Sequence, residues 1–432
     1  MKPSRYNYIH SRDNYSYWYN GLNHTWFRLP KVLGEKVQSI LTNPDEIKEI
    51  NEPFFNSLKD SGFIIDNDID ELAKLRKLNQ QQIDNKFYQL ILVPTLDCNY
   101  KCWYCVQSHI PSRMSDETMT RVKKHIKYMV EVEKINSLSL DWFGGEPFMY
   151  FHEVIRPLCE YSRKICNKHD LPLALTATTN AYYLDESIIP EICELGFTFF
   201  QITLDGPREM HDKVKYMDGC DSAFNRTLHN IECLLRASEQ ITIMLRINYT
   251  SSNLTQELVE QVEHGISARY RNRITIVPKK VWQEAVDKSL FTKTTRILDN
   301  FEKLSFNVAK YDIITTFVPC YASRRYCNVI NYNGDIAKCT SGNELYGEKV
   351  PGHLNQEGII HWNEDHLSKY VTKGFENHRC IACRYLPICM GACPRKFHES
   401  GGQPQCKLEY SDNDLVQSIM NHIDSQYDRQ TN

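Results

Sequence analysis

Six apolar segments alternate with helical segments between residues 86 and 310, and this alternation limits the possible fold more than any other feature of the 432-residue chain. The apolar segments are residues 88–95, 137–143, 173–180, 197–205, 241–249 and 273–280. The helical segments between them are residues 116–133, 151–168, 185–195, 224–238 and 254–265. This order predicts parallel βα units. We therefore expect an α/β fold, either a partial (βα)6 TIM-like barrel or an open sheet, with its chemistry at the carboxyl ends of the strands.

Residues 1–85 have the pattern of a separate small domain. Aromatic and polar residues alternate on both sides of Asn20-Gly21, a dipeptide that favours a tight hairpin. Pro30 suits the first position of a helix, and a second helical segment ends near Gly62. Two strands, two or three short helices and a final strand predict a winged-helix-like domain.

The remaining region, residues 311–432, has no alternation of strands and helices. Eight cysteines lie between residues 320 and 406, and we expect metal to hold this region together. The sequence thus predicts three domains, with boundaries at residues 85/86 and 310/311.

Composition and charge exclude several classes of function. The net charge is −3, so we expect no nucleic-acid partner. The first residues lack the apolar core of a signal peptide and the apolar runs are too short for a bilayer, so we expect a cytoplasmic protein without membrane contact. In that reducing compartment, the chain's 16 cysteines are better explained by metal binding than by disulfides.

Three of these cysteines, Cys98, Cys102 and Cys105, follow directly after the first predicted strand. Thiolates are ligands for zinc and for iron–sulfur clusters. A structural zinc ion would need a fourth, distant ligand, whereas a cubane cluster held by three cysteines leaves one iron open. The spacing favours the iron–sulfur interpretation and leaves a zinc knuckle as the alternative.

A second motif, Gly144-Gly145-Glu146-Pro147, follows the second predicted strand, and together the two motifs resemble the radical S-adenosylmethionine (SAM) superfamily. The resemblance implies that the three cysteines hold a [4Fe–4S] cluster and that SAM binds the open iron. It also implies that Gly144, Gly145 and Glu146 engage the amino group of SAM. Tyr104 stands where the family packs a side chain against the adenine.

Further residues at the ends of later strands match the family: Thr179, Asn180, Thr203, Asp205 and Arg246. The resemblance implies that Thr179 and Asn180 hydrogen-bond SAM. Thr203 and Asp205 would face the SAM ribose or the reacting centre, and Asp205 is the candidate catalytic residue. Arg246 would pair with the SAM carboxylate. The alternative for each is a strand-end cap or a surface residue.

The C-terminal cysteines resemble the SPASM extension, which carries auxiliary iron–sulfur clusters in peptide-modifying members of the superfamily. By position, the resemblance implies one [4Fe–4S] cluster on Cys320, Cys327, Cys339 and Cys393, and a second on Cys380, Cys383, Cys389 and Cys406. A zinc fold built from the same cysteines is the alternative. Most of the other five cysteines, Cys159, Cys166, Cys193, Cys220 and Cys233, are expected to be buried thiols in helices.

The order of the three domains resembles that of maturases of ribosomally made peptides. The implied reaction begins when one electron cleaves SAM, and the resulting radical takes a hydrogen atom from a substrate carbon. The implied partners are a precursor peptide, with its leader bound by residues 1–85 and its core in the barrel, and a one-electron reductant such as flavodoxin or ferredoxin. The expected product is a thioether or carbon–carbon crosslink.

Two alternatives remain open at this point. The sulfatase-maturing branch forms formylglycine and carries an aspartate directly after the cysteine that corresponds to Cys339; here the neighbour is Thr340, although Asp335 is close in sequence. A non-catalytic iron–sulfur electron carrier or peptide-binding scaffold would not need the open-iron triple or the Gly144–Pro147 motif.

Overall fold

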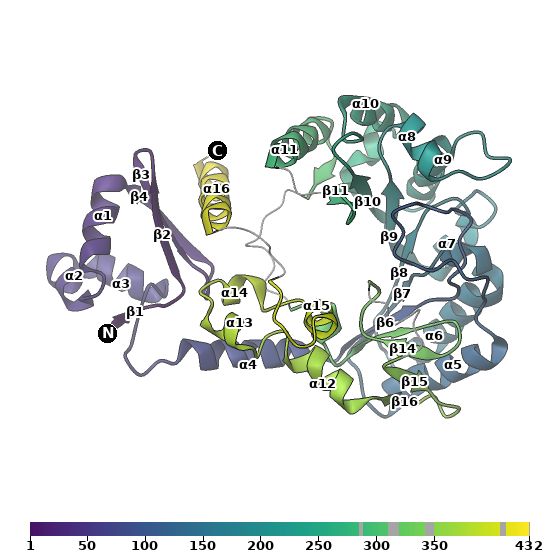
Figure 1. Ribbon diagram of the computed structural model, residues 1–432, viewed down its shortest axis with the longest axis horizontal. Coiled ribbons are helices and arrows are strands. Elements are labelled where there is room, and N and C mark those ends of the chain that lie inside the picture. The colour runs from purple at the N-terminus through teal and green to yellow at the C-terminus, as the bar shows by residue number, and fades with distance from the viewer. Residues whose placement is uncertain (285–287, 310–318, 342–349, 407–411, 432) are drawn as a thin grey trace. The chain divides into compact units, whose positions relative to one another are not determined.

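All six predicted strands lie in the parallel part of one large sheet in the computed structural model, which describes residues 1–284, 288–309, 319–341, 350–406 and 412–431 (Figure 1). They are β6 (Phe87–Leu92), β7 (Ser137–Trp142), β8 (Leu173–Thr179), β9 (Phe197–Leu204), β10 (Thr242–Tyr249) and β11 (Ile274–Lys280). Each pairs in parallel with the next, and the short β12 (Asn307–Val308) pairs with β11. The predicted α/β architecture is confirmed.

The other edge of the sheet is extended by strands that the sequence did not indicate. β13 (Cys327–Ile330) pairs in parallel with β6, and β14 (Asp335–Ala337), β15 (Gly352–Leu354) and β16 (Ile360–Trp362) continue antiparallel. Because β13 occupies the free edge of β6, the eleven strands form an open sheet rather than a closed barrel.

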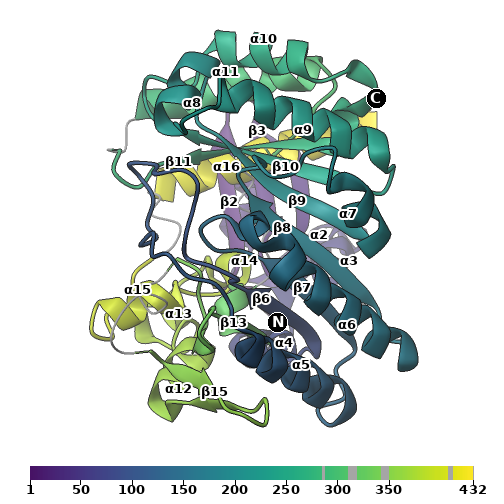
Figure 2. The same cartoon turned by 90° about the vertical axis from the view of Figure 1, so that its right-hand side faces the viewer.

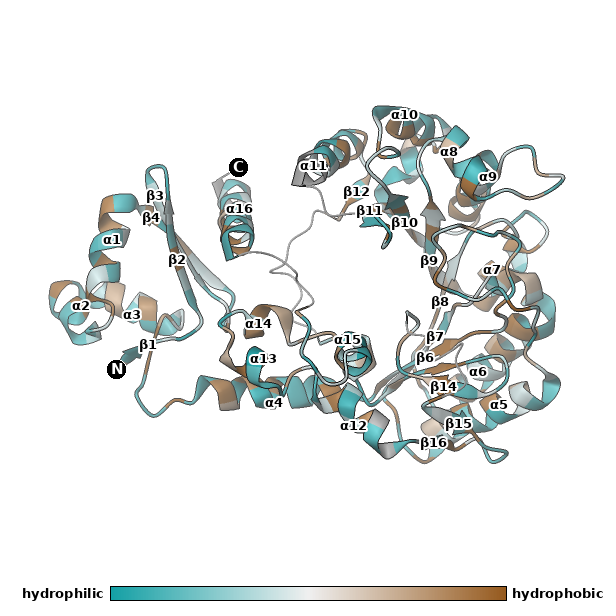
Figure 3. Ribbon diagram, viewed as in Figure 1, coloured by the Kyte–Doolittle hydropathy of each residue, from teal (hydrophilic) through white to brown (hydrophobic). Residues whose placement is uncertain are grey.

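Helices cover one face of the parallel strands (Figure 2). They are α5 (Asp116–Glu131), α6 (Arg156–Lys168) after the π-helical turn Phe151–Ile155, α7 (Ile189–Leu195), α8 (Arg208–Val214), α9 (Ala223–Ala237), α10 (Gln256–Gly265) and α11 (Lys288–Lys303). Ser115, Ser222 and Thr255 cap α5, α9 and α10 by accepting backbone N–H groups, which explains where these helices begin. The strands and the inner helix faces are apolar (Figure 3), and their side chains make one continuous core.

The chain divides into two compact units. The sheet and its helices form the second unit, Lys86–Lys310 with Tyr326–His366, and Met1–Asn85, Tyr311–Arg325 and Leu367–Asn432 form the first. The predicted division at 85/86 coincides with a change of unit, and the division at 310/311 lies outside the described residues. The assignment of three functional domains stays a prediction.

The N-terminal part of the first unit is a three-stranded antiparallel sheet followed by three short helices. The strands are β2 (Asn7–Arg12), β3 (Tyr15–Asn20) and β4 (Thr25–Pro30), and the helices are α1 (Lys31–Ile40), α2 (Pro44–Ile50) and α3 (Glu52–Asp60). The expected hairpin at Asn20-Gly21 is confirmed, because β3 and β4 pair across it. A winged-helix-like identity stays a prediction.

The rest of the first unit is mostly helical. Its elements are the paired strands β1 (Lys2–Pro3) and β5 (Ile64–Ile65), then α4 (Glu71–Ile83), α12 (Glu364–Thr372), α13 (His378–Ala382), α14 (Leu386–Cys389), α15 (Pro394–Glu399) and α16 (Asp412–Thr431). Helices cover both faces of the three-stranded sheet. On one face Trp18 packs among side chains of α1 and α3, and on the other Tyr17 and Tyr19 pack against α16. Within the described residues, no helix is both long and apolar enough to cross a bilayer.

Candidate cofactor site

The loop that carries Cys98, Cys102 and Cys105 leaves the carboxyl end of β6, as the sequence predicts. It contains no helix before α5, so its shape depends on side-chain hydrogen bonds. Thr95 Oγ1 donates to the Ser112 carbonyl at 2.6 Å, which ties the start of the loop to its end. Tyr100 N–H and Gln107 N–H point at the sulfurs of Cys98 and Cys105, at 3.4 and 3.5 Å.

The two glycines of the second motif lie against the cysteine loop. The Gly145 and Glu146 N–H groups donate to the carbonyls of Thr95 and Asp97, at 3.1 and 2.9 Å. A Cβ atom on Gly144 would lie 2.4 Å from the Thr95 carbonyl oxygen, and one on Gly145 would lie 1.9 Å from that of Asp97. Glycine is therefore required at both positions for the two loops to meet. Contact of these residues with the amino group of SAM stays a prediction.

Glu146 joins the end of β7 to the end of β8. Its carboxylate is fully buried and accepts hydrogen bonds from Thr179 Oγ1 at 2.8 Å and from the N–H groups of Asn180 and Phe148 at 2.8 and 3.0 Å. Burial raises the pKa of Glu146 to about 7, although these hydrogen bonds oppose the shift. Glu146 and Thr179 are thus brought together, as members of one site should be.

Asn180 connects β8 to the cysteine loop. Its Nδ2 atom donates to Asn99 Oδ1 at 2.8 Å and lies 3.8 Å from the Cys98 sulfur. Four predicted site residues from three consecutive strand ends, Cys98, Glu146, Thr179 and Asn180, therefore form one hydrogen-bonded group. Their contacts with SAM stay predictions.

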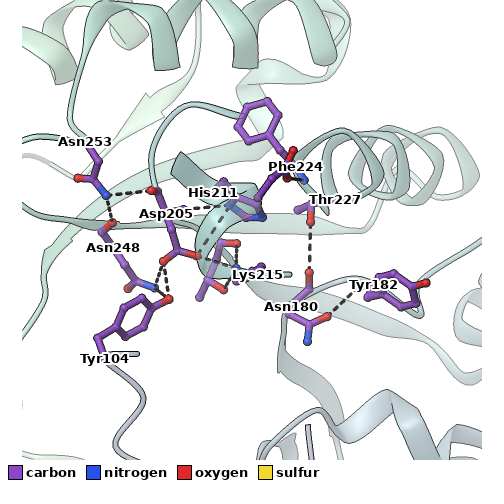
Figure 4. A network of polar contacts seen from close by, with 12 residues as sticks. Tyr104, Asn180, Tyr182, Asp205, His211, Lys215, Phe224, Thr227, Asn248 and Asn253 are labelled. Carbon is purple, nitrogen blue, oxygen red and sulfur yellow. Dashed lines mark hydrogen bonds and ion pairs between the residues drawn. The ribbon is translucent and has the colours of Figure 1, made fainter. Parts of the chain in front are cut away.

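Asp205 lies directly after β9 at the centre of a second group of buried polar side chains (Figure 4). Its carboxylate accepts hydrogen bonds from the Tyr104 hydroxyl and from Asn248 Nδ2, the latter at 3.2 Å, and lies 3.2 Å from Lys215 Nζ. Burial alone would raise the pKa of Asp205, but the charge of Lys215 and these hydrogen bonds hold it below its ordinary value. Asp205 is an ion-paired carboxylate here, and its assignment as a catalytic residue stays a prediction.

Tyr104 reaches this second group from the cysteine loop. Its hydroxyl donates to Asp205 and accepts from Asn248 Nδ2 at 3.0 Å. Burial and the neighbouring Asp205 carboxylate raise the pKa of Tyr104, so the phenol stays protonated and can donate. Packing of its ring against adenine stays a prediction.

Lys215, His211 and Asn248 belong to the second polar group, although the sequence motifs do not point to them. Lys215 is 3% exposed and donates to Thr203 Oγ1 at 2.7 Å as well as pairing with Asp205. The predicted residue Thr203 therefore faces a buried cation. Burial lowers the pKa of His211 to about 3, so the ring is neutral and its Nδ1 accepts the Asp205 N–H at 3.1 Å.

Signals for these residues were present in the sequence. His211 and Lys215 lie within ten residues of Asp205 in the segment that resembles the family. Asn248 follows Arg246 by two positions on one strand, so their side chains point to the same face.

Arg246 lies on β10 in register with Thr203 on β9, and its side chain therefore points toward the same face of the sheet. Its Nε atom is buried and has no hydrogen-bond partner among the described residues. Burial lowers the pKa of Arg246, while Tyr104 and Asp205 raise it. A partly buried guanidinium without a bonded anion fits the carboxylate of a bound ligand.

The three thiols of the first motif fit a cluster better than a single ion. Among the described residues, they do not come within 4.8 Å of one another as a group of three, which a tetrahedral zinc site requires. Burial raises the pKa of Cys98 to about 12 and that of Cys102 to about 11, so a bound cationic centre is needed to keep them as thiolates. Three cysteine thiols are a donor set that fits a [4Fe–4S] cluster.

The C-terminal cysteines share one local feature with Cys98 and Cys105. In each case the backbone N–H of the second residue after the cysteine points at the cysteine sulfur. The distances are 3.4 Å for Cys339, 3.4 Å for Cys383 and 3.5 Å for Cys389. Such N–H groups stabilise cluster-bound thiolates. The two predicted cluster assignments stay predictions. Of the five remaining cysteines, four lie in helices as expected, and Cys220 does not.

Comparison with known proteins agrees with this geometry. Residues 92–272 match the model of the Radical SAM superfamily. A radical SAM cyclopropyl synthase, TigE, from Paramaledivibacter caminithermalis is 28% identical over 81% of this chain and 76% of its own length. An Fe-coproporphyrin III synthase from Methanosarcina barkeri is 26% identical over 69% of this chain and 80% of its own.

Two further proteins are similar at lower identity. A cysteine-type anaerobic sulfatase-maturating enzyme from Clostridium novyi is 20% identical over 71% of this chain and 87% of its own length. The structure of Streptococcus suis SuiB bound to its precursor peptide SuiA superposes with a TM-score of 0.53 at 16% identity, over 92% of this chain and 96% of SuiB, which shows a shared fold. The family match and the geometry lead to one conclusion: the chain carries a radical SAM domain over residues 92–272.

Proposed function

We propose that this chain is a radical SAM peptide maturase that takes a hydrogen atom from a ribosomal precursor peptide and installs a thioether or carbon–carbon crosslink. One observation carries the proposal: hydrogen bonds join the cysteine loop, Glu146 and Asn180 at the carboxyl ends of β6, β7 and β8 in the radical SAM domain. Arg246 on β10 lies near Tyr104 of that loop, and its Nε atom has no hydrogen-bond partner among the described residues. When bound, the cluster and SAM supply the hydrogen-atom abstraction.

The protein's own residues bind and orient these groups. Cys98, Cys102 and Cys105 hold the cluster, and Arg246 binds the SAM carboxylate. Asp205 and Lys215 form a buried ion pair that fixes one side of the cofactor site, because each side chain neutralises the charge of the other. Burial of this network also keeps water away from the reacting carbon.

A peptide substrate is supported by two features. SuiB has the same fold and was solved with its precursor peptide. In the N-terminal sheet, β4 is an edge strand, because β3 is its only partner within the described residues. An extended leader peptide can add to such an edge through backbone hydrogen bonds. We therefore assign leader binding to residues 1–85.

The C-terminal cysteines complete the proposal as ligands of two auxiliary [4Fe–4S] clusters. One is assigned to Cys320, Cys327, Cys339 and Cys393, and the other to Cys380, Cys383, Cys389 and Cys406. A reconstituted protein should then contain about twelve iron atoms, and Cys389→Ala should lose about four of them. The reductant, flavodoxin or ferredoxin, stays a predicted partner.

The test is to incubate reconstituted protein with SAM, a reductant and candidate precursor peptides. The expected product is lighter than the peptide by two hydrogens, and 5′-deoxyadenosine forms with it. The matched controls are a Cys98→Ala variant and the same peptide without its leader, and both should give little product. If the mass of every candidate peptide stays unchanged, the proposal is refuted.

Sulfatase maturation is the second candidate, supported by the relative from Clostridium novyi. Thr340 follows Cys339, and the nearby Asp335 carboxylate is already paired with His353 Nδ1 at 2.9 Å, so neither supplies the free aspartate of that branch. Capture of an aldehyde on the product with a hydrazide reagent would favour this activity. An electron carrier or scaffold would form no 5′-deoxyadenosine at all.

A further inference from the structure

A group of three metal-binding side chains lies away from the cofactor site, on the helical face of the sheet. His229 and Cys233 are four residues apart on α9 and therefore lie on one side of that helix. Glu186 comes from the loop between β8 and α7, and α7 lies beside α9 (Figures 1 and 2). One ligand atom from each residue lies within 4.8 Å of the other two.

The two distances from the Cys233 sulfur match edges of a tetrahedron around one ion, and the third pair of atoms lies within 4.8 Å. Cys233 Sγ is 3.5 Å from Glu186 Oε1 and 3.6 Å from His229 Nε2. Zinc bonds of about 2.0–2.3 Å to sulfur, nitrogen and oxygen, at tetrahedral angles, place sulfur about 3.5 Å from oxygen and about 3.6 Å from nitrogen. Thiolate, imidazole and carboxylate together are a donor set that zinc accepts.

A cation already lies against this group. Arg236 Nη2 is 3.2 Å from Glu186 Oε1 and 3.3 Å from Cys233 Sγ. Its side chain is 56% exposed, so it can move into solvent when a metal ion takes its place. The Glu186 side chain is 67% exposed, which leaves room for water as a fourth ligand.

The position of the group connects it to the cofactor site. The loop between β8 and α7 begins at Asn180, which contacts the cysteine loop. Arg226 and Asn230 of α9 already hold this loop, by donating to the carbonyls of Tyr182 at 2.9 Å and Ala181 at 2.8 Å. An ion at Glu186 would add an anchor at the far end of the same loop.

We propose that Glu186, His229 and Cys233 bind a zinc ion that fixes the loop after β8 to α9. On binding, a zinc–sulfur bond forms, and the thiol proton of Cys233 passes to solvent. This site is separate from the predicted clusters and does not depend on the proposed reaction.

The test compares the zinc content and stability of reconstituted full-length protein after incubation with zinc chloride and desalting, both without oxygen. Wild type should retain about one more zinc per chain than His229→Ala, because zinc at any other cysteines is the same in both. His264→Ala and Cys193→Ala are matched controls, an exposed histidine and a partly buried cysteine outside the group, and both should keep the wild-type zinc content. Zinc should raise the Tm of wild type by more than that of His229→Ala.

Arg236→Gln supplies a second test that does not remove a ligand. If the guanidinium competes with zinc, this variant should bind zinc more tightly than wild type in a chelator competition. If the group is only a hydrogen-bonded cluster, wild type and His229→Ala will hold equal zinc and Arg236→Gln will gain no affinity, and the proposal is overturned.

Discussion

Replacing Lys215 by methionine tests whether the buried Asp205–Lys215 ion pair stabilises the fold around the candidate cofactor site. The two charges are 3.2 Å apart and both side chains are 2% exposed. At an effective dielectric constant of about 20, their attraction is about 5 kcal/mol. Removing one partner of such a pair costs about 3–5 kcal/mol, because the remaining charge is buried without a counterion.

The assay is thermal unfolding of the protein without clusters, together with SAM binding to the reconstituted protein. A loss of 3–5 kcal/mol should lower the Tm by roughly 6–20 °C for a unit of this size. Lys127→Met is the control, because Lys127 forms an exposed pair with Glu131 at 3.4 Å, and such pairs contribute about 0–1 kcal/mol. The double variant Asp205→Asn with Lys215→Met should recover part of the loss, since no buried charge remains.

The stability difference between wild type and Lys215→Met should also change with pH in a definite direction. In wild type the pKa of folded Asp205 lies below its ordinary value, so the pair's contribution is present above about pH 4, the unfolded pKa, and is lost as the pH falls through the folded pKa. In Lys215→Met, burial should raise the pKa of Asp205 instead, so the variant's deficit should be largest at pH 7 and shrink toward pH 5. A deficit below 1 kcal/mol at pH 7, or one that grows on acidification, would refute the argument.

Three further outcomes follow from the site. Gly145→Ala should abolish SAM cleavage and lower the Tm, since its Cβ would lie 1.9 Å from the Asp97 carbonyl; Gly219→Ala, with open space around it, should cost only about 1 kcal/mol. The pKa of Glu146 in the folded protein is about 7, so its protonated carboxyl group stabilises the cluster-free protein below about pH 4.5. This contribution to the free energy of unfolding is lost as the pH rises to 7. Glu146→Gln should therefore flatten that part of the curve of stability against pH. Arg246→Gln should weaken SAM binding about 10- to 100-fold, as measured by calorimetry, without lowering the Tm, because Arg246 has no bonded anion to lose within the part of the chain that the structure describes.

The parallel sheet and the main elements of the site could be predicted from sequence for physical reasons. The strands appear as apolar runs because nearly all of their positions are buried or partly buried, and helices between them carry their own caps, such as Ser115 and Ser222. In a parallel sheet all carboxyl ends lie at one edge, so motifs after successive strands must converge. The Cys98 loop and Glu146 meet for this reason, although Cys98 and Glu146 are 48 positions apart in the sequence.

Other features could not be predicted because they depend on long-range pairing. β13 to β16 are only three or four residues each, too short for a period of two to be recognised. The first of them is fixed by its pairing with β6, more than 230 residues earlier in the chain. Lys215 was missed because a lysine in a polar segment is ordinarily exposed, and its burial follows only from the position of Asp205.

Some charged groups of the candidate site are neutralised within the protein, and others would be neutralised by the proposed ligand. Asp205 and Lys215 neutralise each other. Glu146 is surrounded by neutral donors and its pKa of about 7 leaves it on the border of ionisation, while Arg246 has no bonded anion among the described residues. A ligand with a carboxylate and an ammonium group on one carbon would pair with Arg246 and favour ionised Glu146 at once. A partly buried cation and a buried carboxyl group poised near neutral pH each carry a cost in the protein alone, and such a ligand relieves both.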